Sequence, residues 1–305
     1  MLIEDNYTLH RRFDRMGRLV GDEAMKKLFA SHVMVIGIGG VGSWAAESLS
    51  RSGVGKLTLV DFDDICITNI NRQLHAQQNL VGQKKATVMA ERLKKVNPQA
   101  QVLGVEKFFN ADSMEEIFAM EPDLIIDAID NVTAKCLLLS EATRRGIRIH
   151  SCGGAGGRMD PLKIKRADLS ETYLDPLLVQ VRKILRSQYG FPSEGPFAIP
   201  TVFSTEEITQ PVELKYDKGM GFKCVCPQGS NNFHSCEKRN VIYGTASFVT
   251  GAFGLAIASE VVKDLLGERH YEKIELPSLE QVALLRAQAR VADAGSGGCA
   301  HHQHA

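Results

Sequence analysis

Short apolar runs alternate with helical stretches over the first half of the chain. The apolar runs are rich in Val, Ile and Leu, which favours strands that are buried on both faces. The predicted strands are His32–Gly39, Lys56–Asp63, Gln101–Phe108, Asp123–Asp130 and Arg148–Gly154. The predicted helices are Val41–Ser52, Lys84–Val96, Ser113–Met120 and Ala134–Arg145. This order predicts an α/β, Rossmann-like, doubly wound and mostly parallel sheet with helices on both faces.

The alternation becomes less regular after Gly157. Lys163–Ser170 is a candidate strand, and Asp175–Gly190 has the spacing of an amphipathic helix. Phe191–Pro200 contains three prolines and is predicted to be a loop. Thr205–Arg239 has only a weak hydrophobic pattern and is predicted to be an irregular segment that leaves the main fold. We divide the chain into an N-terminal helical arm (1–30), a nucleotide-binding Rossmann-like domain (31–170), a C-terminal α+β extension packed on it (171–293) and a disordered tail (294–305).

Val241–Ser259 runs for 19 residues without a charge, a length that could span a bilayer. The alternative is a helix buried in a large domain or in a dimer interface. We favour this alternative because the segment has three glycines and several hydroxyl residues, and lacks the Leu and Ile that make membrane insertion favourable. Membrane association is therefore open but not favoured.

Charge and cysteine content exclude some classes of protein. The 305 residues include 36 Lys and Arg and 36 Asp and Glu, so no overall basic field indicates a nucleic-acid partner, although a local patch is not excluded. The seven cysteines are scattered and odd in number, which favours a reduced, cytoplasmic compartment over a disulfide scaffold. The N-terminus lacks the apolar run of a secretory signal.

Glycine-rich sequence between the first predicted strand and helix indicates a nucleotide site. Gly37, Gly39, Gly40 and Gly42 would let backbone amides approach a phosphate at the helix N-terminus. Asp61, at the end of the second strand, is placed to accept hydrogen bonds from ribose hydroxyls. These features alone fit a nicotinamide oxidoreductase or an ATP-binding enzyme, and a tight structural turn is the alternative.

Polar residues further along favour ATP. Arg72 and the helix start at Lys84 and Lys85 offer cations for a triphosphate, whereas a dehydrogenase needs little charge beyond its glycine turn. A carboxylate at the end of the fourth strand could hold Mg²⁺. Asp127 is expected to point into the scaffold, which leaves Asp130 as the better ligand.

Four motifs together resemble the ubiquitin-activating-enzyme superfamily, whose bacterial members adenylate small sulfur-carrier proteins. They are "GIGGVGSWAAESLSRSGVGKLTLVDFDD", "NINRQ", "VGQKKA" and "IDAIDN". The resemblance implies that Gly40 and Asp61 hold adenosine, and that an N-terminal arginine, Arg15 or Arg18, crosses a homodimer to the site. It implies further contacts to ATP, its phosphates and Mg²⁺ by Asp63, Asn69, Arg72, Gln73, Lys85, Asp130 and Asn131. Arg72, Lys85 and Asp130 are the implied catalytic residues, and Asp130 is the implied metal ligand.

Two later motifs are similar to the tRNA threonylcarbamoyladenosine dehydratase branch of that superfamily. They are "CGGAGGRMDPLKIKRADLSETYLDPL" and "VFSTE", and the chain lacks the two C-x-x-C zinc pairs common among sulfur-carrier activators. The branch implies ATP-dependent cyclisation of threonylcarbamoyladenosine beside the anticodon, through adenylation of its threonyl carboxylate. The alternative is an adenylyltransferase for a ubiquitin-like sulfur carrier. A cysteine desulfurase or sulfur acceptor is a further implied partner.

Several residues keep both a functional and a structural interpretation. The glycines between 153 and 157 either approach the substrate base or make a sharp bend, and the thiols Cys136 and Cys152 are expected to be structural. Basic residues that could contact tRNA are Arg158, Lys163, Lys165, Arg166, Arg182, Lys183 and Arg186. Zinc ligands could come from Cys224, Cys226, His234 and Cys236, but C-x-C spacing disfavours them. The histidines of the tail are expected to be solvated.

Overall fold

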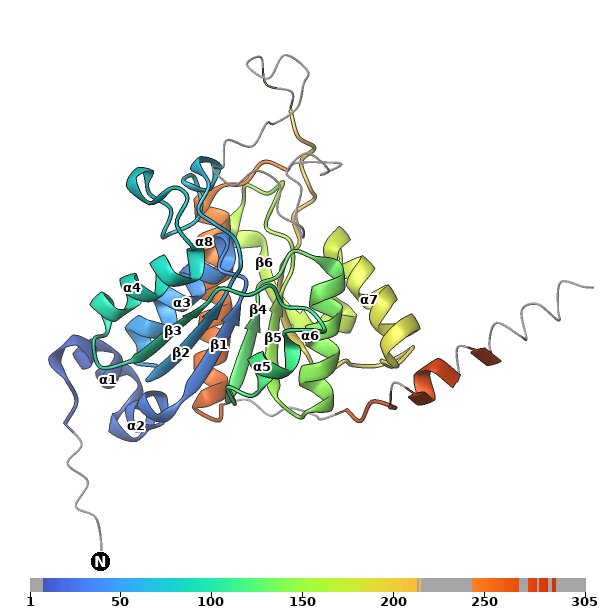
Figure 1. The fold of residues 1–305 in the computed structure, drawn as a ribbon, viewed down its shortest axis with the longest axis horizontal. Helices are drawn as coiled ribbons and strands as arrows, with labels where there is room; N and C mark the ends of the chain where they lie inside the picture. The colour runs from blue at the N-terminus through green and yellow to red at the C-terminus, as the bar shows by residue number, and fades with distance from the viewer. Residues whose placement is uncertain are drawn as a thin grey trace, which may run out of the picture.

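A seven-stranded sheet forms the centre of the computed structural model, which describes residues 8–212, 214, 243–268, 274–278, 280–284 and 287–288. The strand order is β3-β2-β1-β4-β5-β7-β6 (Figure 1). The strands are β1 (His32–Ile36), β2 (Lys56–Val60), β3 (Gln101–Val105), β4 (Leu124–Asp127), β5 (Arg148–Cys152), β6 (Ile164–Asp168) and β7 (Pro200–Ser204). All neighbours pair in parallel except β6, which runs antiparallel to β7 at one edge. The chain order reverses between β1 and β4, and ligands bind outside the carboxyl ends of the strands at such a point.

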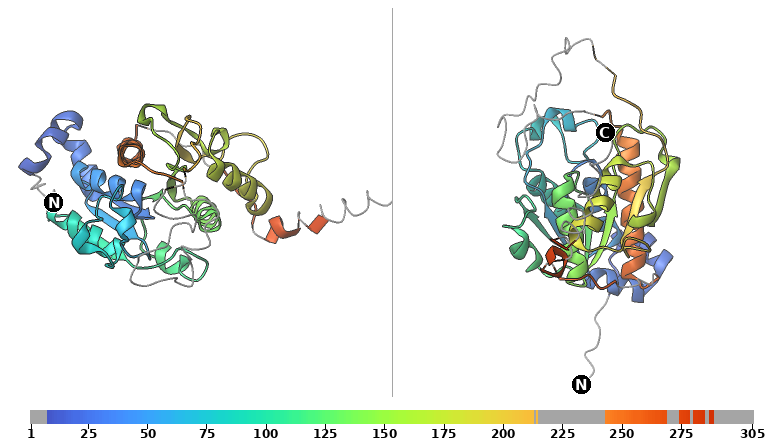
Figure 2. Two further views of the ribbon diagram at one scale, coloured as in Figure 1. Left: turned by 90° about the horizontal axis from the view of Figure 1, so that it is seen from above. Right: turned by 90° about the vertical axis from the view of Figure 1, so that its right-hand side faces the viewer.

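Helices cover both faces of the sheet, as predicted (Figure 2). They are α1 (Asp14–Val20), α2 (Asp22–Ala30), α3 (Gly40–Ser52), α4 (Lys85–Val96), α5 (Met114–Phe118), α6 (Val132–Arg144), α7 (Pro176–Tyr189) and α8 (Ser247–Leu265). Alternate residues of β1 enter different cores, because successive strand side chains point to opposite faces. Val33 and Val35 pack with α3, α4 and α8, whereas Met34 and Ile36 pack with α5, α6 and α7.

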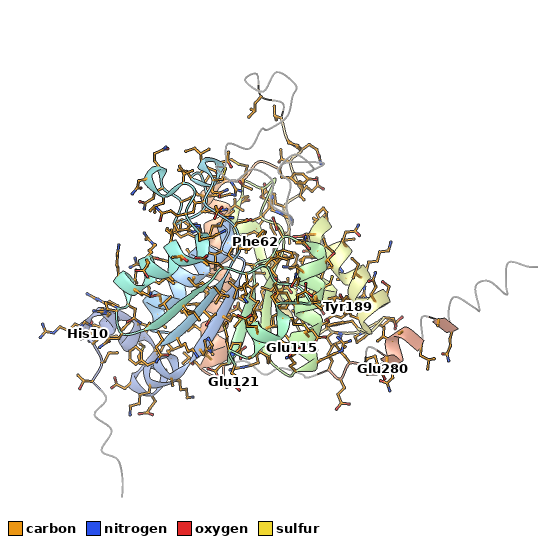
Figure 3. All side chains as sticks on the ribbon, in the orientation of Figure 1. His10, Phe62, Glu115, Glu121, Tyr189 and Glu280 are labelled. Carbon is orange, nitrogen blue, oxygen red and sulfur yellow. The ribbon has the colours of Figure 1, made fainter. Side chains whose placement is uncertain are left out.

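The predicted elements are present, but the strands end earlier than predicted. β1, β2 and β4 each stop before the polar or glycine residues that the sequence prediction included. Asp61 follows β2 directly, and Asp130 lies in the loop three positions beyond the end of β4 rather than at the strand end. The carboxyl edge of the sheet therefore consists of loops, and Figure 3 labels Phe62 at this edge and Glu121 at the opposite one.

The region after Gly157 extends the same sheet. α7 begins after Asp175, whose side chain accepts a hydrogen bond from Leu178 N, and ends at Gly190 in a left-handed conformation. Phe191–Ile199 is a loop, as predicted, but β7 was not predicted. This five-residue strand begins at a proline and lies between β5 and β6, so the predicted extension supplies an inner strand of the sheet.

The uncharged segment near the C-terminus is largely α8, which packs against α3. Gly254 allows this contact, because a Cβ there would lie 2.6 Å from Trp44 Cβ and from Val41 O. Among the described residues, none of the helices has the length and apolarity needed to cross a membrane. Phe248 and Leu255 on α8 remain about half exposed.

Candidate functional site

Four glycines shape the turn between β1 and α3, and the structure gives them different tasks. A Cβ on Gly42 would lie 1.9 Å from Gly37 O, and one on Gly37, whose φ is +92°, would lie 2.6 Å from Ala128 O. A Cβ on Gly40 would lie 3.1 Å from the Thr250 side chain, so packing constrains all three positions. Gly39 differs, because its closest neighbour would be Gln73 Nε2 at 3.9 Å.

Gly39 is also the N-cap residue of α3, so no side chain at this position caps the first amides of the helix. The first amides of a helix lack partners within the helix and carry its partial positive charge. The open space at Gly39 therefore lies where an anion can approach these amides.

A buried cluster of charges lies beside the glycine turn. Asp61 Oδ2 accepts a hydrogen bond from Ile38 N at 2.6 Å, and Asp61 Oδ1 accepts one from Asp63 N at 2.9 Å. Lys85 Nζ pairs with Asp63 Oδ2 at 2.7 Å, and its side chain is only 8% exposed. Asp61 is thus held against the turn, and Lys85 lies behind the two carboxylates.

Burial and mutual attraction set the charge states of this cluster. Burial alone would lower the pKa of Lys85, but attraction to Asp61, Asp63 and Asp130 outweighs it and raises that pKa. Burial raises the pKa of Asp61, and Asp63 adds to the rise against the attraction of Lys85. Lys85 is therefore positively charged, as a contact to phosphate requires. It also interacts electrostatically with Asp130.

The segment after the cluster packs over the turn. Asn69 is buried, and its Oδ1 accepts a hydrogen bond from Cys66 N at 2.9 Å. Trp44 Nε1 donates to Arg72 O at 3.1 Å, which anchors the Arg72 backbone to α3. Arg72 Nη1 donates to Thr68 O at 3.0 Å. The residues of the predicted phosphate segment are therefore brought next to α3.

The side chain of Gln73 holds a buried hydrogen-bond acceptor that is unpaired in the described part of the chain. Its side chain is buried near Gly39, and its Oε1 has no hydrogen-bond partner in the described part of the chain. A buried acceptor without a donor costs free energy, so a ligand or water that donates a hydrogen bond here would stabilise the site. A ribose or adenine group offers such a donor.

The loop after β4 separates two aspartates with different tasks. Asp127 is fully buried and pairs with the fully buried Lys135 at 2.7 Å. Its Oδ1 accepts a hydrogen bond from Ile129 N at 3.1 Å, and Lys135 Nζ donates to Ile129 O at 3.1 Å. Asp127 therefore points into the scaffold, as predicted, and the pair fixes the backbone that carries Asp130.

Asp130 and Asn131 follow on this fixed backbone. Asp130 is exposed, whereas Asn131 caps α6 by accepting a hydrogen bond from Ala134 N at 3.0 Å. The exposed carboxylate near Lys85 fits a Mg²⁺ ligand, since Mg²⁺ prefers few carboxylates and keeps several waters. No cluster of three or more metal-ligating side chains occurs among the residues that the structure describes.

The glycine loop after β5 is held by a buried ion pair. Asp175 Oδ2 accepts a hydrogen bond from Gly154 N at 2.9 Å and lies 3.4 Å from Arg158 Nη2. Arg158 also donates to the backbone oxygens of Ser204, Glu206, Leu174 and Gly154. The prediction that Arg158 contacts tRNA is therefore wrong, because five hydrogen-bonded neighbours in the protein surround its buried guanidinium.

Packing supports the sharp-bend interpretation at two of the loop glycines. A Cβ on Gly153 would lie 2.2 Å from Asp175 Oδ2, and one on Gly157, with φ of +71°, would lie 2.6 Å from Ile208 Cγ2. Gly154 has no neighbour closer than 3.8 Å to the same position. The loop is thus tightly anchored on both sides of a more open centre.

The remaining candidates have mixed outcomes. Cys136 and Cys152 are buried, and burial raises the pKa of each thiol to about 12, so both are structural as expected. Of the basic residues, Lys163, Lys165, Arg166, Lys183 and Arg186 are exposed, and Arg166 also pairs with Glu260 at 3.0 Å. The proposed zinc ligands between 224 and 236 and the histidine-rich tail lie outside the described residues.

Sequence reasoning missed Lys135, the role of Asp175 and the buried His75. Lys135 stands among apolar residues of a predicted helix, a position where a lysine signals a buried partner. His75 is 1% exposed, neither ring nitrogen has a partner among the described residues, and burial lowers its pKa to about 3. Nothing in its sequence context distinguishes it from a surface histidine.

A parallel sheet with an open helix N-terminus, a buried lysine and an exposed carboxylate at its switch point defines a nucleotide-binding protein of the Rossmann-like class. The ThiF family matches residues 13–296, and the chain belongs to this family.

Individual relatives are similar to this chain over most of its length. The tRNA threonylcarbamoyladenosine dehydratase of Haemophilus influenzae is 40% identical over 268 residues, which cover 87% of this chain and 96% of that protein. The Escherichia coli enzyme of the same name is 38% identical and is covered to 94%. A solved structure of the E. coli dehydratase, TcdA, in complex with ATP has 36% identity and a TM-score of 0.72, and covers 88% of this chain and 98% of that one.

Proposed function

We propose that the chain catalyses the ATP-dependent dehydration of threonylcarbamoyladenosine beside the anticodon of tRNA, which closes a ring in the modified nucleoside. The observation that carries the proposal is the extent of the match. The dehydratases of H. influenzae, E. coli and Bacillus subtilis align with 85–88% of this chain, whereas the molybdopterin-synthase adenylyltransferase of E. coli aligns with 38% of it. Similarity to the adenylyltransferase thus concerns less than half of the chain, whereas similarity to the dehydratases includes the region after Gly157.

The reaction needs a leaving group that a carboxylate lacks. The threonyl carboxylate attacks the α-phosphate of ATP, which forms an acyl-adenylate and releases pyrophosphate. The carbamoyl group of the same nucleoside then attacks the activated carbonyl, and AMP leaves. The net change in the nucleoside is the loss of one water molecule. Ring closure is intramolecular, so holding the nucleoside in place supplies much of its rate.

The residues of the site suit the first step. The proposed phosphate contacts are the amides at Gly39, Gly40 and the α3 N-terminus, together with Lys85 and Arg72. These groups stabilise the charge that develops as pyrophosphate departs. Asp130 is the proposed residue that would hold Mg²⁺, and the metal would supply positive charge that stabilises the departing pyrophosphate.

The adenosine end is assigned to the opposite side of the turn. Asp61 is proposed to accept from the ribose hydroxyls, and its two hydrogen bonds to Ile38 N and Asp63 N support this by fixing the carboxylate. Asp63, Asn69 and Gln73 complete the proposed ATP contacts, with the unpaired Gln73 Oε1 as the strongest support. Asn131, which follows Asp130 in the same loop, is proposed to contribute to the contacts with ATP, its phosphates and Mg²⁺.

A cytoplasmic homodimer is the proposed assembly. α1 and α2 precede β1 and lie at the amino edge of the sheet, whereas the candidate site is at the carboxyl edge (Figure 1). This placement supports the proposal that an N-terminal arginine serves the ATP site of a second copy. Arg18 pairs with Asp14 in its own helix at 3.0 Å, which favours Arg15 as the residue that crosses. A sulfur-transfer partner stays a prediction.

The test offers the enzyme two acyl substrates. Purified protein is incubated with ATP and Mg²⁺, and with either tRNA that carries threonylcarbamoyladenosine or a small carrier protein that ends in Gly-Gly. We expect AMP and pyrophosphate to accumulate only with the tRNA. Adenylation of the carrier without any change in the tRNA would instead establish the adenylyltransferase alternative.

A further inference from the structure

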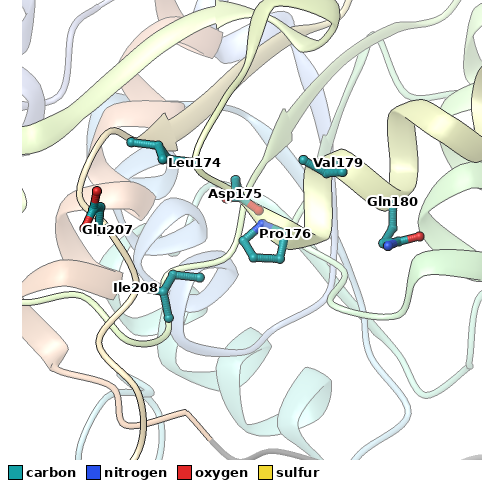
Figure 4. A pocket seen from close by; sticks show the side chains of 7 residues that line it. All are labelled: Leu174, Asp175, Pro176, Val179, Gln180, Glu207 and Ile208. Atoms are coloured by element: carbon teal, nitrogen blue, oxygen red, sulfur yellow. The ribbon is translucent and has the colours of Figure 1, made fainter.

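A concavity of about 440 Å³ lies at the start of α7, beside the glycine loop (Figure 4). It is lined by Leu174, Asp175, Pro176, Val179, Gln180, Glu207 and Ile208. None of these residues belongs to the proposed ATP site. The volume is ample for one planar heterocycle and its solvent.

Two contacts tie this pocket to the candidate site. Asp175 forms part of its wall, and the same carboxylate accepts from Gly154 N at 2.9 Å and from Leu178 N at 3.1 Å. On the other wall, Ile208 packs on Gly157, and Thr209 N donates to Gly157 O at 2.8 Å. The glycine loop follows β5, whose neighbour β4 leads to Asp130. The pocket therefore borders the glycine loop at the carboxyl end of β5, on the edge of the sheet where the reaction is proposed.

The lining has the character of a site for a nucleobase. Leu174, Pro176, Val179 and Ile208 offer apolar surface for the faces of a ring. Gln180 and Glu207 lie on opposite sides of the pocket (Figure 4), where an amide and a carboxylate can meet the polar edges of a base. RNA-binding proteins read unstacked loop bases by covering their faces, most often with aromatic side chains or Arg, and by hydrogen bonds to their edges. In this pocket aliphatic side chains would cover the faces of the base.

Backbone strain and charge add independent support. Leu174 adopts a left-handed conformation with φ of 54° although 46% of it is exposed, and such strain is typical of functional sites. Lys183 is exposed on α7 three residues after Gln180 and four after Val179, so it lies on the pocket side of the helix one turn further on. A cation there complements the phosphate of the nucleotide whose base is bound in the pocket.

We propose that this pocket binds a nucleobase of the anticodon loop that neighbours the reacting nucleoside. The proposal rests on the proposed function, because it assigns the pocket to the same tRNA substrate. Binding of a neighbouring base would splay the loop and hold the modified nucleoside over the glycine loop. ATP binding does not involve these residues.

The test combines a pocket variant with an altered RNA. Gln180→Leu removes the amide while keeping the volume, and Ser187→Ala, on an exposed position two turns along α7, is the matched control. The probe is an anticodon stem-loop RNA with threonylcarbamoyladenosine, intact or with an abasic site on one side of that nucleoside. RNA affinity is measured by fluorescence anisotropy, and ATP affinity is measured by calorimetry.

We expect Gln180→Leu to weaken binding of the intact RNA by about tenfold to a hundredfold, in line with one good base contact. The control should bind like the wild type, and ATP affinity should not change. One of the two abasic RNAs should bind wild type and Gln180→Leu equally. If the variant binds intact RNA normally, or if its defect persists with both abasic RNAs, the pocket proposal is refuted. Failure of the wild type to dehydrate an RNA that it binds would refute the proposed function instead.

Discussion

Removing the charge of Lys135 should destabilise the fold and disturb the Asp130 loop together. Lys135 and Asp127 are both fully buried and lie 2.7 Å apart, and Ser151 Oγ donates to the same Asp127 oxygen at 2.6 Å. Lys135→Met keeps most of the side-chain volume but leaves the Asp127 carboxylate without its counter-charge. Removing one partner of a buried pair typically costs about 3–5 kcal/mol. The variant also deletes the hydrogen bond from Nζ to Ile129 O.

Urea unfolding measures this loss. The chain has one tryptophan, Trp44, whose indole packs against α8 and donates to Arg72 O, so its fluorescence reports on the folded site. We expect Lys135→Met to lose about 3–5 kcal/mol of unfolding free energy. The double variant with Asp127→Asn, which removes the unpaired charge but keeps an acceptor oxygen for Ile129 N or Ser151 Oγ, should recover most of that loss. Lys94→Met, which breaks the exposed pair with Glu91, should leave stability nearly unchanged. A loss below about 1 kcal/mol in Lys135→Met would refute the inference that the buried pair is ionised.

Three further predictions concern the site. Gly39→Ala should fold normally but bind ATP more weakly, whereas Gly42→Ala should unfold at much lower urea, because its Cβ would lie 1.9 Å from Gly37 O; equal stability of the two would contradict the packing argument. Asp130→Ala and Arg72→Ala should each lower kcat by about a hundredfold to a thousandfold, or about 3–4 kcal/mol, with unchanged circular dichroism; activity within a few-fold of wild type would remove them from the phosphate site. His75 has a folded pKa of about 3, so below pH 6.5 the unfolded state binds the extra proton and stability falls by up to about 1.4 kcal/mol per pH unit. His75→Phe should flatten that fall between pH 6.5 and 5.5, and an unchanged slope would show that His75 is charged when folded.

The periodic parts of the fold were predictable from sequence, and the connections were not. β1 (HVMVI) and β4 (LIID) are largely apolar and buried at every position, as expected for central strands of a sheet that is covered on both faces. β7 escaped prediction because a five-residue strand that starts at Pro200 resembles the end of the preceding proline-rich loop. The residues just beyond the ends of β1, β2 and β4 were predicted to belong to the strands, because the hydrophobic pattern does not show where the chain leaves the sheet.

The candidate site shows the same division. Glycines and charged residues are recognisable by residue type, so the sequence could place Gly39, Asp61, Lys85 and Asp130 near one edge of the sheet, while their roles toward ATP stay a prediction. Sequence does not report pairing, however. Arg158 looked like a surface cation beside other basic residues, yet the fold closes several backbone carbonyls around it. Only the folded chain separates a buried structural charge from a charge that is available to a ligand.

Dehydration of a tRNA nucleoside with consumption of ATP can be measured on the purified protein. The protein is incubated with ATP, Mg²⁺ and tRNA that carries threonylcarbamoyladenosine, and the nucleosides are analysed by mass spectrometry while the nucleotide products are quantified. We expect a nucleoside lighter by one water molecule, with one AMP and one pyrophosphate formed for each nucleoside converted. An unchanged nucleoside under conditions where the protein binds both ATP and the tRNA would show that the chain does not catalyse this reaction, and ADP as the co-product would refute the adenylation step.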